Sequence, residues 1–316
     1  MLFWQGILYT VVVRANTDHN SLYVLRTEET QVKNIFYTDL AAEALNAWEQ
    51  GQNRALSGLA AGREEREGFA ADVAEIRDRE TSEALCKPIG RYVTLDLGAL
   101  IRREEDAFPR ACRALAGELR RQLRLESGMS VLAVCLGNPD ITPDAVGPLT
   151  AEHILVTRHL KETMPEAFGS FRPVAVFRVG VLGTTGVESA ALAAAVAGQV
   201  KPDAVIAVDA LAAREPERLC RSVQITDAGI VPGSGVGNAR AALNRETLGV
   251  PVVAVGVPTV IDVRALYPDS EWREELFVTP RDVDSRVRTA ARLVGYAVNM
   301  ALHEGLTPED IDMFLS

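Results

Sequence analysis

The sequence predicts an α/β fold with a mainly parallel sheet flanked by helices. Four short apolar runs have the composition of buried parallel strands, since each is rich in Val, Ile, Leu and Ala. These runs cover residues 131–136, 174–177, 204–208 and 252–257. Segments with helical spacing lie between them, and strands that alternate with helices imply right-handed crossovers within one sheet.

Helices are expected before, between and after these strands. Good helix formers follow Thr38 and Asp39, and either of these two residues can cap a helix. Pro109 suits a first helical turn, and Leu115 and Leu119 follow it at helical spacing. The expected helical ranges are 39–48, 109–125, 148–160, 187–200, 238–248 and 283–303.

Residues 52–98 differ in character from the rest of the chain. Residues 64–80 are densely charged, and residues 91–97 are rich in β-prone side chains. We therefore expect a β-rich insertion at one edge of the sheet. The remaining organisation is an N-terminal segment, residues 1–39, followed by a single α/β domain, residues 40–316.

The composition excludes several classes of function. The chain has 33 basic and 43 acidic residues and a net charge of −10, so no broad basic surface for nucleic acid is expected. Hydrophobic residues make up 47% and charged residues 24%, as in globular proteins. The sequence has no run of about 18 apolar residues, so no membrane-spanning helix is expected. Four scattered cysteines fit a reducing compartment.

Two aspartates follow the ends of predicted strands, where ligands of open α/β sheets gather. Asp144 lies in a loop rich in Pro and Gly, and Asp209 directly follows an apolar run. Two close carboxyl groups that lose solvent adopt different protonation states. The ionised one can then take a proton from water while the protonated one polarises a carbonyl. From the residues alone, the alternative that each aspartate only caps the next helix or turn is favoured, because Asp is common at both kinds of place.

Two weaker candidates lie near these aspartates. Asp140 is in the same loop as Asp144 and ranks below it, because it precedes a Thr-Pro turn. A small, polar segment precedes the predicted helix 187–200, and its backbone N–H groups could bind a carbonyl or an oxyanion. A simple strand-to-helix turn explains this segment equally well. It consists of Gly183, Thr184, Thr185 and Gly186.

No metal ion and no other cofactor is expected. His153 and His159 are too far apart in sequence to share a helix face as paired ligands. The segment from Gly233 resembles a dinucleotide-binding loop, but Asn238 stands where its last glycine should be. The chain also has no phosphate-binding P-loop and no G-x-S-x-G motif.

Several blocks of sequence together carry a family resemblance. They are residues 38–44, 87–95, 138–149, 183–188, 201–214, 227–238 and 256–262. These blocks closely resemble the spore germination protease family of endospore-forming bacteria, in the order in which that family has them. The first residues, 1–34, match nothing in that family.

The resemblance implies an endopeptidase that degrades small, acid-soluble spore proteins during germination, in the cytoplasm of the spore core. It implies an unusual aspartic-type peptidase without a cofactor, whose catalytic aspartates correspond to Asp144 and Asp209. The implied fold is similar to that of hydrogenase-maturation peptidases. The implied assembly is a homotetramer, made as a zymogen. The implied partners are the spore proteins, without direct contact to nucleic acid or membrane.

A self-cleavage site is also implied by the resemblance. The family cuts substrates within a Thr-Glu-aromatic/aliphatic-Ala-Ser-Glu type of sequence, and residues 38–43 are similar to it. We therefore expect self-cleavage between Asp39 and Leu40. Two alternatives remain open, namely a metal-associated maturation peptidase of the same fold acting on another protein, and a binding module without activity.

Overall fold

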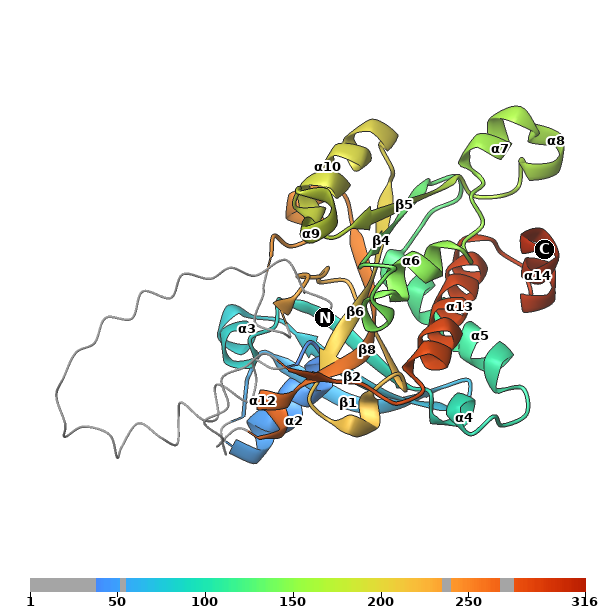
Figure 1. Cartoon of the computed structure of the whole chain (residues 1–316). Helices are drawn as coiled ribbons and strands as arrows, with labels where there is room; N and C mark the ends of the chain where they lie inside the picture. The colour runs from blue at the N-terminus through green and yellow to red at the C-terminus, as the bar shows by residue number, and fades with distance from the viewer. Residues whose placement is uncertain (1–37, 52–54, 235–239, 268–275) are drawn as a thin grey trace, which may run out of the picture.

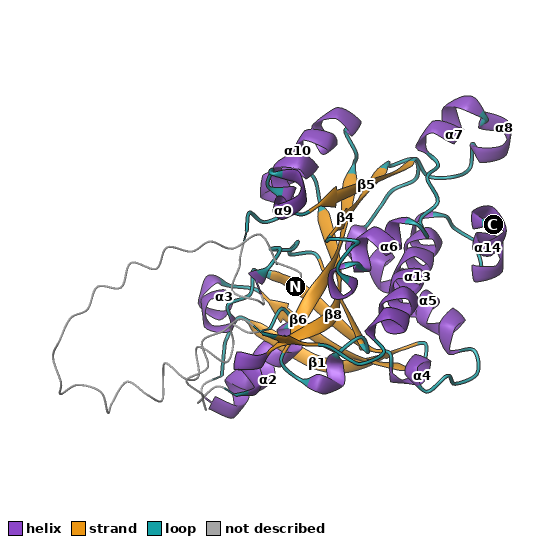
Figure 2. Ribbon diagram, in the orientation of Figure 1, coloured by secondary structure: helices purple, strands orange, loops and turns teal. Residues whose placement is uncertain are grey.

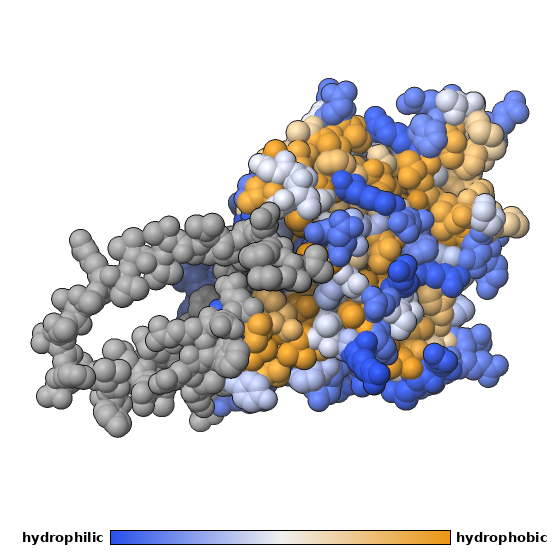
Figure 3. All heavy atoms as spheres, viewed as in Figure 1, coloured by the Kyte–Doolittle hydropathy of each residue, from blue (hydrophilic) through white to orange (hydrophobic). Residues whose placement is uncertain are grey.

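The computed structural model of the chain describes residues 38–51, 55–234, 240–267 and 276–316 (Figure 1). Most of the predicted N-terminal propeptide, residues 1–39, lies outside the described residues. Within the described parts, none of the helices is long and apolar enough to cross a membrane. On the face drawn in Figure 3, hydrophobic and hydrophilic residues are interspersed.

One mixed sheet of nine strands forms the centre of the described structure. Figure 2 draws the strands in orange between the helices. Its strand order is β1-β2-β3-β7-β8-β6-β4-β5, and β9 pairs with β8. The strands are β1 (Leu59–Arg66), β2 (Phe69–Ile76), β3 (Gly90–Asp96), β4 (Val131–Leu136), β5 (Val174–Gly180), β6 (Ala204–Ala213), β7 (Ser222–Thr226), β8 (Val252–Asp262) and β9 (Phe277–Val278).

The four predicted parallel strands are all present and parallel to one another. They are β5, β4, β6 and β8, and they lie side by side in this order. The remaining neighbours pair antiparallel, so the sheet as a whole is mixed rather than mainly parallel. The predicted β-rich edge is confirmed, because β1, β2 and β3 form one end of the strand order.

Helices cover both faces of the sheet. The longest, α5 and α13, pack against each other and against the sheet together with α6, while α10 covers the other face (Figure 2). The helices are α2 (Ala41–Gly51), α3 (Arg79–Leu85), α4 (Gly98–Ile101), α5 (Ala107–Leu123), α6 (Val146–Ala151), α7 (Arg158–Thr163), α8 (Pro165–Phe168), α9 (Leu182–Thr185), α10 (Ser189–Val200), α11 (Arg245–Leu248), α12 (Val263–Leu266), α13 (Val283–Leu302) and α14 (Pro308–Leu315).

Two predicted helices are wrong in extent, and each has a tertiary cause. The predicted helix 148–160 is broken into α6 and α7, because Asn299 of α13 binds the intervening backbone. Its side chain accepts from the Leu155 N–H at 2.8 Å and donates to the His153 carbonyl at 2.8 Å. The predicted helix 238–248 is reduced to α11, because Leu243 instead exchanges two backbone hydrogen bonds with Ile230.

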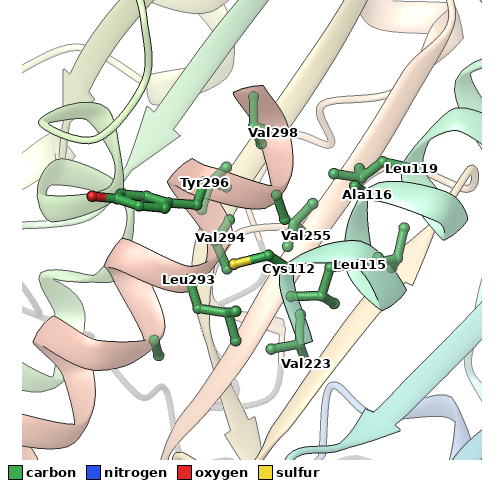
Figure 4. Packing of buried hydrophobic residues seen from close by; sticks show 14 of the residues in the cluster. Cys112, Leu115, Ala116, Leu119, Val223, Val255, Leu293, Val294, Tyr296 and Val298 are labelled. Carbon is green, nitrogen blue, oxygen red and sulfur yellow. The ribbon is translucent and has the colours of Figure 1, made fainter. Parts of the chain in front are cut away.

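The main hydrophobic core lies between the sheet and the helices α5 and α13. Leu115 of α5 and Leu293 of α13 are fully buried there beside Val223 and Val255 of the sheet (Figure 4). Burying one such Leu side chain stabilises the fold by roughly 1.5–3 kcal/mol. This packing fixes the strands β7 and β8, which support the site described next.

Candidate active site

The site lies where the connections of the sheet change direction. The chain leaves β4 for β5 on one side and later enters β6 on the other side of β4. Such a switch point opens a crevice beyond the carboxyl ends of the two central strands. Asp144 follows β4 and Asp209 is on β6, so the topology brings both predicted aspartates to this end of the two strands.

Asp144 ends a short 3-10 helix, Thr142–Asp144, in the loop after β4. Its Oδ2 atom accepts a hydrogen bond of 2.8 Å from the Asn138 backbone N–H. The fully buried Thr259 of β8 donates to the Pro143 carbonyl at 2.7 Å and so ties the loop to the sheet. The N-cap residue of α6 is Ala145, so the alternative in which Asp144 only caps this helix is wrong.

Two glycines allow the Asp144 loop to lie directly on the strand ends. Gly137 has a φ of +115°, and a Cβ atom there would lie 2.0 Å from the Asp144 carbonyl oxygen. A Cβ atom at Gly147 would lie 2.1 Å from the Leu136 carbonyl oxygen and 2.8 Å from that of Val208. The close backbone contact therefore depends on the absence of side chains at both positions.

Asp209 lies inside β6 rather than at the tip of the strand, which corrects the prediction for this residue and also excludes a capping role. The strand continues to Ala213 because β8 pairs with it over this whole length. The pairing with β4 ends earlier, at Val208 and Cys135. Asp209 is consequently the first residue of β6 after its pairing with β4 ends, and it is only 6% exposed.

Both carboxyl groups have raised pKa values, and burial is the main cause. Desolvation raises the pKa of Asp144 to about 6, although the hydrogen bond from the Asn138 N–H opposes this shift. Desolvation also raises the pKa of Asp209 well above its usual range. The negative charges of Asp144 and, to a smaller extent, Asp39 raise the pKa of Asp209 further. The two predicted aspartates therefore interact through their charges.

The segment Gly183 to Gly186 differs from its prediction. It belongs largely to the short helix α9, and its residues are exposed. The N–H groups of Thr184 and Thr185 donate to the Val181 carbonyl, and the N–H of Gly186 donates to the Leu182 carbonyl. The expectation of free N–H groups is therefore wrong for these three residues, because their N–H groups are used within the turn itself.

Asp39 and Leu40, the predicted self-cleavage residues, lie against β6. The Asp39 N–H donates to the Ala212 carbonyl at 2.9 Å, and the Ala212 N–H donates to Asp39 Oδ2 at 2.8 Å. The Ser234 hydroxyl donates to the other oxygen of the Asp39 carboxyl group. Leu40 is fully buried and packs in a cluster with Leu211. The segment is thus held on the strand that carries Asp209.

Sequence reasoning missed two polar side chains that bind this segment. The Gln224 side chain of β7 donates to the Asp39 carbonyl at 3.1 Å and accepts from the Ala41 N–H at 2.8 Å. Lys87 Nζ donates to the Thr38 carbonyl at 2.7 Å. Both side chains line a cavity of about 360 Å³ that also borders Asp39.

One sequence signal could have drawn attention to each of these residues. Lys87 opens one of the blocks that carry the family resemblance. In the structure its side chain is buried, with only 8% exposed. Burial lowers the pKa of Lys87, although the Asp39 charge opposes this effect. Gln224 interrupts the otherwise apolar pair Val223 and Ile225 in a short β-prone run. A buried polar side chain in such a run requires a hydrogen-bond partner.

The described residues do not provide the ligands of a metal site. Across residues 38–51, 55–234, 240–267 and 276–316, no group of three or more His, Cys, Asp or Glu side chains is placed to hold a metal ion. The cysteines are free thiols; Cys86 is exposed, and Cys112, Cys135 and Cys220 are buried. Burial raises the pKa of Cys135 to about 12, so this thiol stays protonated at neutral pH.

Comparisons with known proteins identify the family. A family model described as germination protease matches residues 37–272. The germination protease of Caldanaerobacter subterraneus subsp. tengcongensis is 36% identical, over 88% of this chain and 97% of the relative. That of Clostridium perfringens strain 13 is 33% identical, over 88% and 98% respectively. That of Bacillus cytotoxicus is 41% identical, over 74% and 65%.

A search of solved structures found the [NiFe] hydrogenase maturation protease HycI from Thermococcus kodakarensis KOD1. The two chains are 20% identical with a TM-score of 0.34, over 57% of this chain and 98% of the other. The family assignment rests on the sequence comparisons, which cover most of the chain and nearly the full length of several relatives. The chain therefore belongs to the germination protease family.

Proposed function

We propose that this protease cuts small, acid-soluble spore proteins and that Asp144 and Asp209 together activate the attacking water. The observation that carries the proposal is the position of the two carboxyl groups at one switch point, with raised pKa values and interacting charges. Carboxyl pairs with separated protonation states serve as acid and base in hydrolysis. The family resemblance supports the same two residues.

The environments of the two aspartates suggest their roles. Each carboxyl group accepts one backbone N–H, from Asn138 for Asp144 and from Ala210 for Asp209, but Asp209 lies deeper and the charges of Asp144 and Asp39 raise its pKa further. We therefore assign the base to Asp144 and the acid to Asp209. Asp144 accepts a proton from water while the water oxygen bonds to the carbonyl carbon. Asp209 then gives its proton to the peptide nitrogen as the C–N bond breaks, which yields a carboxyl group and an amine.

The assignment predicts a pH profile with two limbs. The rate of peptide hydrolysis should rise through a pH of about 6 as Asp144 ionises, and it should fall at higher pH as Asp209 loses its proton. The measurement is kcat/KM for a peptide substrate between about pH 4 and about pH 9. A rate that falls steadily as the pH rises from 4 to 7 would contradict the assignment of Asp144 as the base.

We further propose that the chain is a zymogen that cuts its own Asp39–Leu40 bond. This proposal is supported by the position of Asp39, which is hydrogen-bonded along β6 and whose charge acts on Asp209. The family resemblance supports removal of the N-terminal segment. It also supports a homotetrameric assembly and a location in the cytoplasm of the spore core.

The proposed function is tested with the purified full-length chain and a small, acid-soluble spore protein. Intact-mass analysis after incubation should show cleavage of the spore protein and a shortened chain that begins at Leu40. Both reactions should continue in the presence of a chelator. Cleavage that stops with the chelator and returns with a divalent cation would support the metal-associated alternative. An inert protein would support the binding module, and a different new N-terminus would refute the self-cleavage site.

A further inference from the structure

We propose that Gln224 is a further catalytic residue, which binds the carbonyl oxygen of the peptide bond that is cut and stabilises the negative charge that develops there. This inference rests on the proposed self-cleavage between Asp39 and Leu40. The oxygen attacked in that reaction would be the Asp39 carbonyl, and Gln224 Nε2 already donates a hydrogen bond to it at 3.1 Å. Donors at about 2.7–3.1 Å from the developing oxyanion are the usual means of this stabilisation.

The register of the sheet places Gln224 in one row with Asp209. Gln224 of β7 pairs with Gly256 of β8, and Gly256 pairs with Asp209 of β6. Paired residues of neighbouring strands point to the same face of a sheet. Because neighbouring strands lie about 4.8 Å apart, the Cα atoms of Gln224 and Asp209 are separated by about 10 Å. An amide donor and a catalytic carboxyl group can thus approach one peptide from two sides.

The residue between them leaves room for the Leu211 side chain. Gly256 has no side chain, and a Cβ atom there would lie 2.3 Å from Leu211 Cδ1. Leu211 in turn packs in the cluster that contains Leu40, the residue after the bond. Gly256, Leu211 and Gln224 all line the cavity beside Asp39. The row therefore has a polar group at each end and an apolar contact for Leu40 in between.

Gln224 also fixes the position of the Asp39–Leu40 bond relative to β7. Its amide donates to the carbonyl before the Asp39–Leu40 bond and accepts from the Ala41 N–H after it, at 2.8 Å. One planar amide therefore binds the backbone on both sides of Leu40. Lys87 adds a second donor one residue earlier, at the Thr38 carbonyl. Because an amide does not titrate, Gln224 can donate at every pH at which the two aspartates work.

Two substitutions separate the proposed role from packing. Gln224→Met has a similar length and no hydrogen-bond donor. Gln224→Glu can still accept from the Ala41 N–H but donates to Asp39 only when it is protonated. The matched control is Ser222→Ala, on the same strand, where the buried hydroxyl has no hydrogen-bond partner among the described residues. All three are made in the full-length chain, and thermal unfolding checks the fold of each.

The readout is the first-order rate at which the chain beginning at Leu40 appears, followed by intact mass. Gln224→Met should slow this rate by about 10²- to 10³-fold at every pH, as expected for loss of one oxyanion donor. The Gln224→Glu rate, divided by the wild-type rate, should fall as the pH rises and its carboxyl group ionises. Ser222→Ala should process at the wild-type rate.

The outcomes distinguish this inference from the proposed function. If the wild-type chain cuts itself and folded Gln224→Met cuts at the same rate, the inference about Gln224 is wrong while the proposed function stands. A Gln224→Glu deficit that is equal at all pH values would also overturn it, since a packing defect would not follow ionisation. If the wild-type chain does not cut itself at all, the proposed self-cleavage fails and the inference fails with it.

Discussion

Replacing either Asp144 or Asp209 by Asn should abolish peptide hydrolysis and yet stabilise the folded protein at neutral pH. Each substitution removes a group that transfers a proton, so the rate should fall by at least about 10³-fold. Self-cleavage and cleavage of a spore protein measure the activity, and urea unfolding measures the stability. The matched control is Asp140→Asn, in the same loop and exposed, which should keep both wild-type properties.

The stabilisation follows from the direction of the pKa shifts. A carboxyl group with a raised pKa in the folded state adds stability that is complete below its unfolded pKa, near 4. That stability is lost as the pH rises through the folded pKa. For Asp144, a rise from 3.8 to about 6 corresponds to about 3 kcal/mol lost at neutral pH. Asn does not titrate, so the variants avoid this loss.

A particular combination of results would contradict this explanation. If Asp144→Asn or Asp209→Asn retained activity, the paired mechanism would be wrong. A second contradicting result would be a variant that is inactive, less stable than the wild type at pH 7 and equally stable at pH 4. In that case the ionised carboxyl group would stabilise the folded state. The raised pKa values would then not describe this site.

Gly137→Ala should also have a large effect, on activity and stability together, because it displaces the Asp144 loop. A Cβ atom at this position would lie 2.0 Å from the Asp144 carbonyl oxygen, and the residue has a φ of +115°. The loop must therefore move, and a misplacement of about 1 Å typically costs about 10²-fold in rate. The strained backbone should lower the free energy of unfolding by about 1–3 kcal/mol. Self-cleavage rate and urea unfolding measure the two effects.

Gly128→Ala separates the loss of activity from the backbone strain. Gly128 has a φ of +83°, but a Cβ atom there would meet no other atom within 4 Å. This control should lose about 1 kcal/mol of stability and keep its activity. Equal activity losses in both variants would show that general destabilisation, and not the position of Asp144, limits the rate.

The elements that the sequence predicted well are those with local patterns. The apolar runs at 131–136 and 252–257 and the helical spacing over 283–303 indicate their structures without knowledge of distant residues. The misplaced boundaries have distant causes. Asn299 breaks the helix predicted over 148–160, and β8 extends β6 through Asp209. Asn299 lies 144 positions from Leu155, and β8 is separated from β6 by β7 and α11, so neither contact leaves a periodic signal in the segment that it changes.

The candidate site was predictable to a similar degree. Asp144 and Asp209 follow from the rule that ligands gather at strand ends, even though β6 continues beyond Asp209. Their proposed roles needed the family resemblance, because aspartates are also common as caps. Gln224 stands out as a polar residue in an apolar run, but its partner could not be predicted, since the contact with Asp39 spans 185 positions and depends on the register of β7 and β8.

The central claim is that Asp144 and Asp209 form one interacting pair. The direct measurement is an NMR titration of the protein labelled with ¹³C at the aspartate carboxyl carbons, in the wild type and in Asp144→Asn. Two carboxyl groups of the wild type should titrate above the usual range, and Asp209 should titrate at a lower pH in the variant, because the charge of Asp144 is gone. An unchanged pKa of Asp209 in Asp144→Asn would contradict the claim.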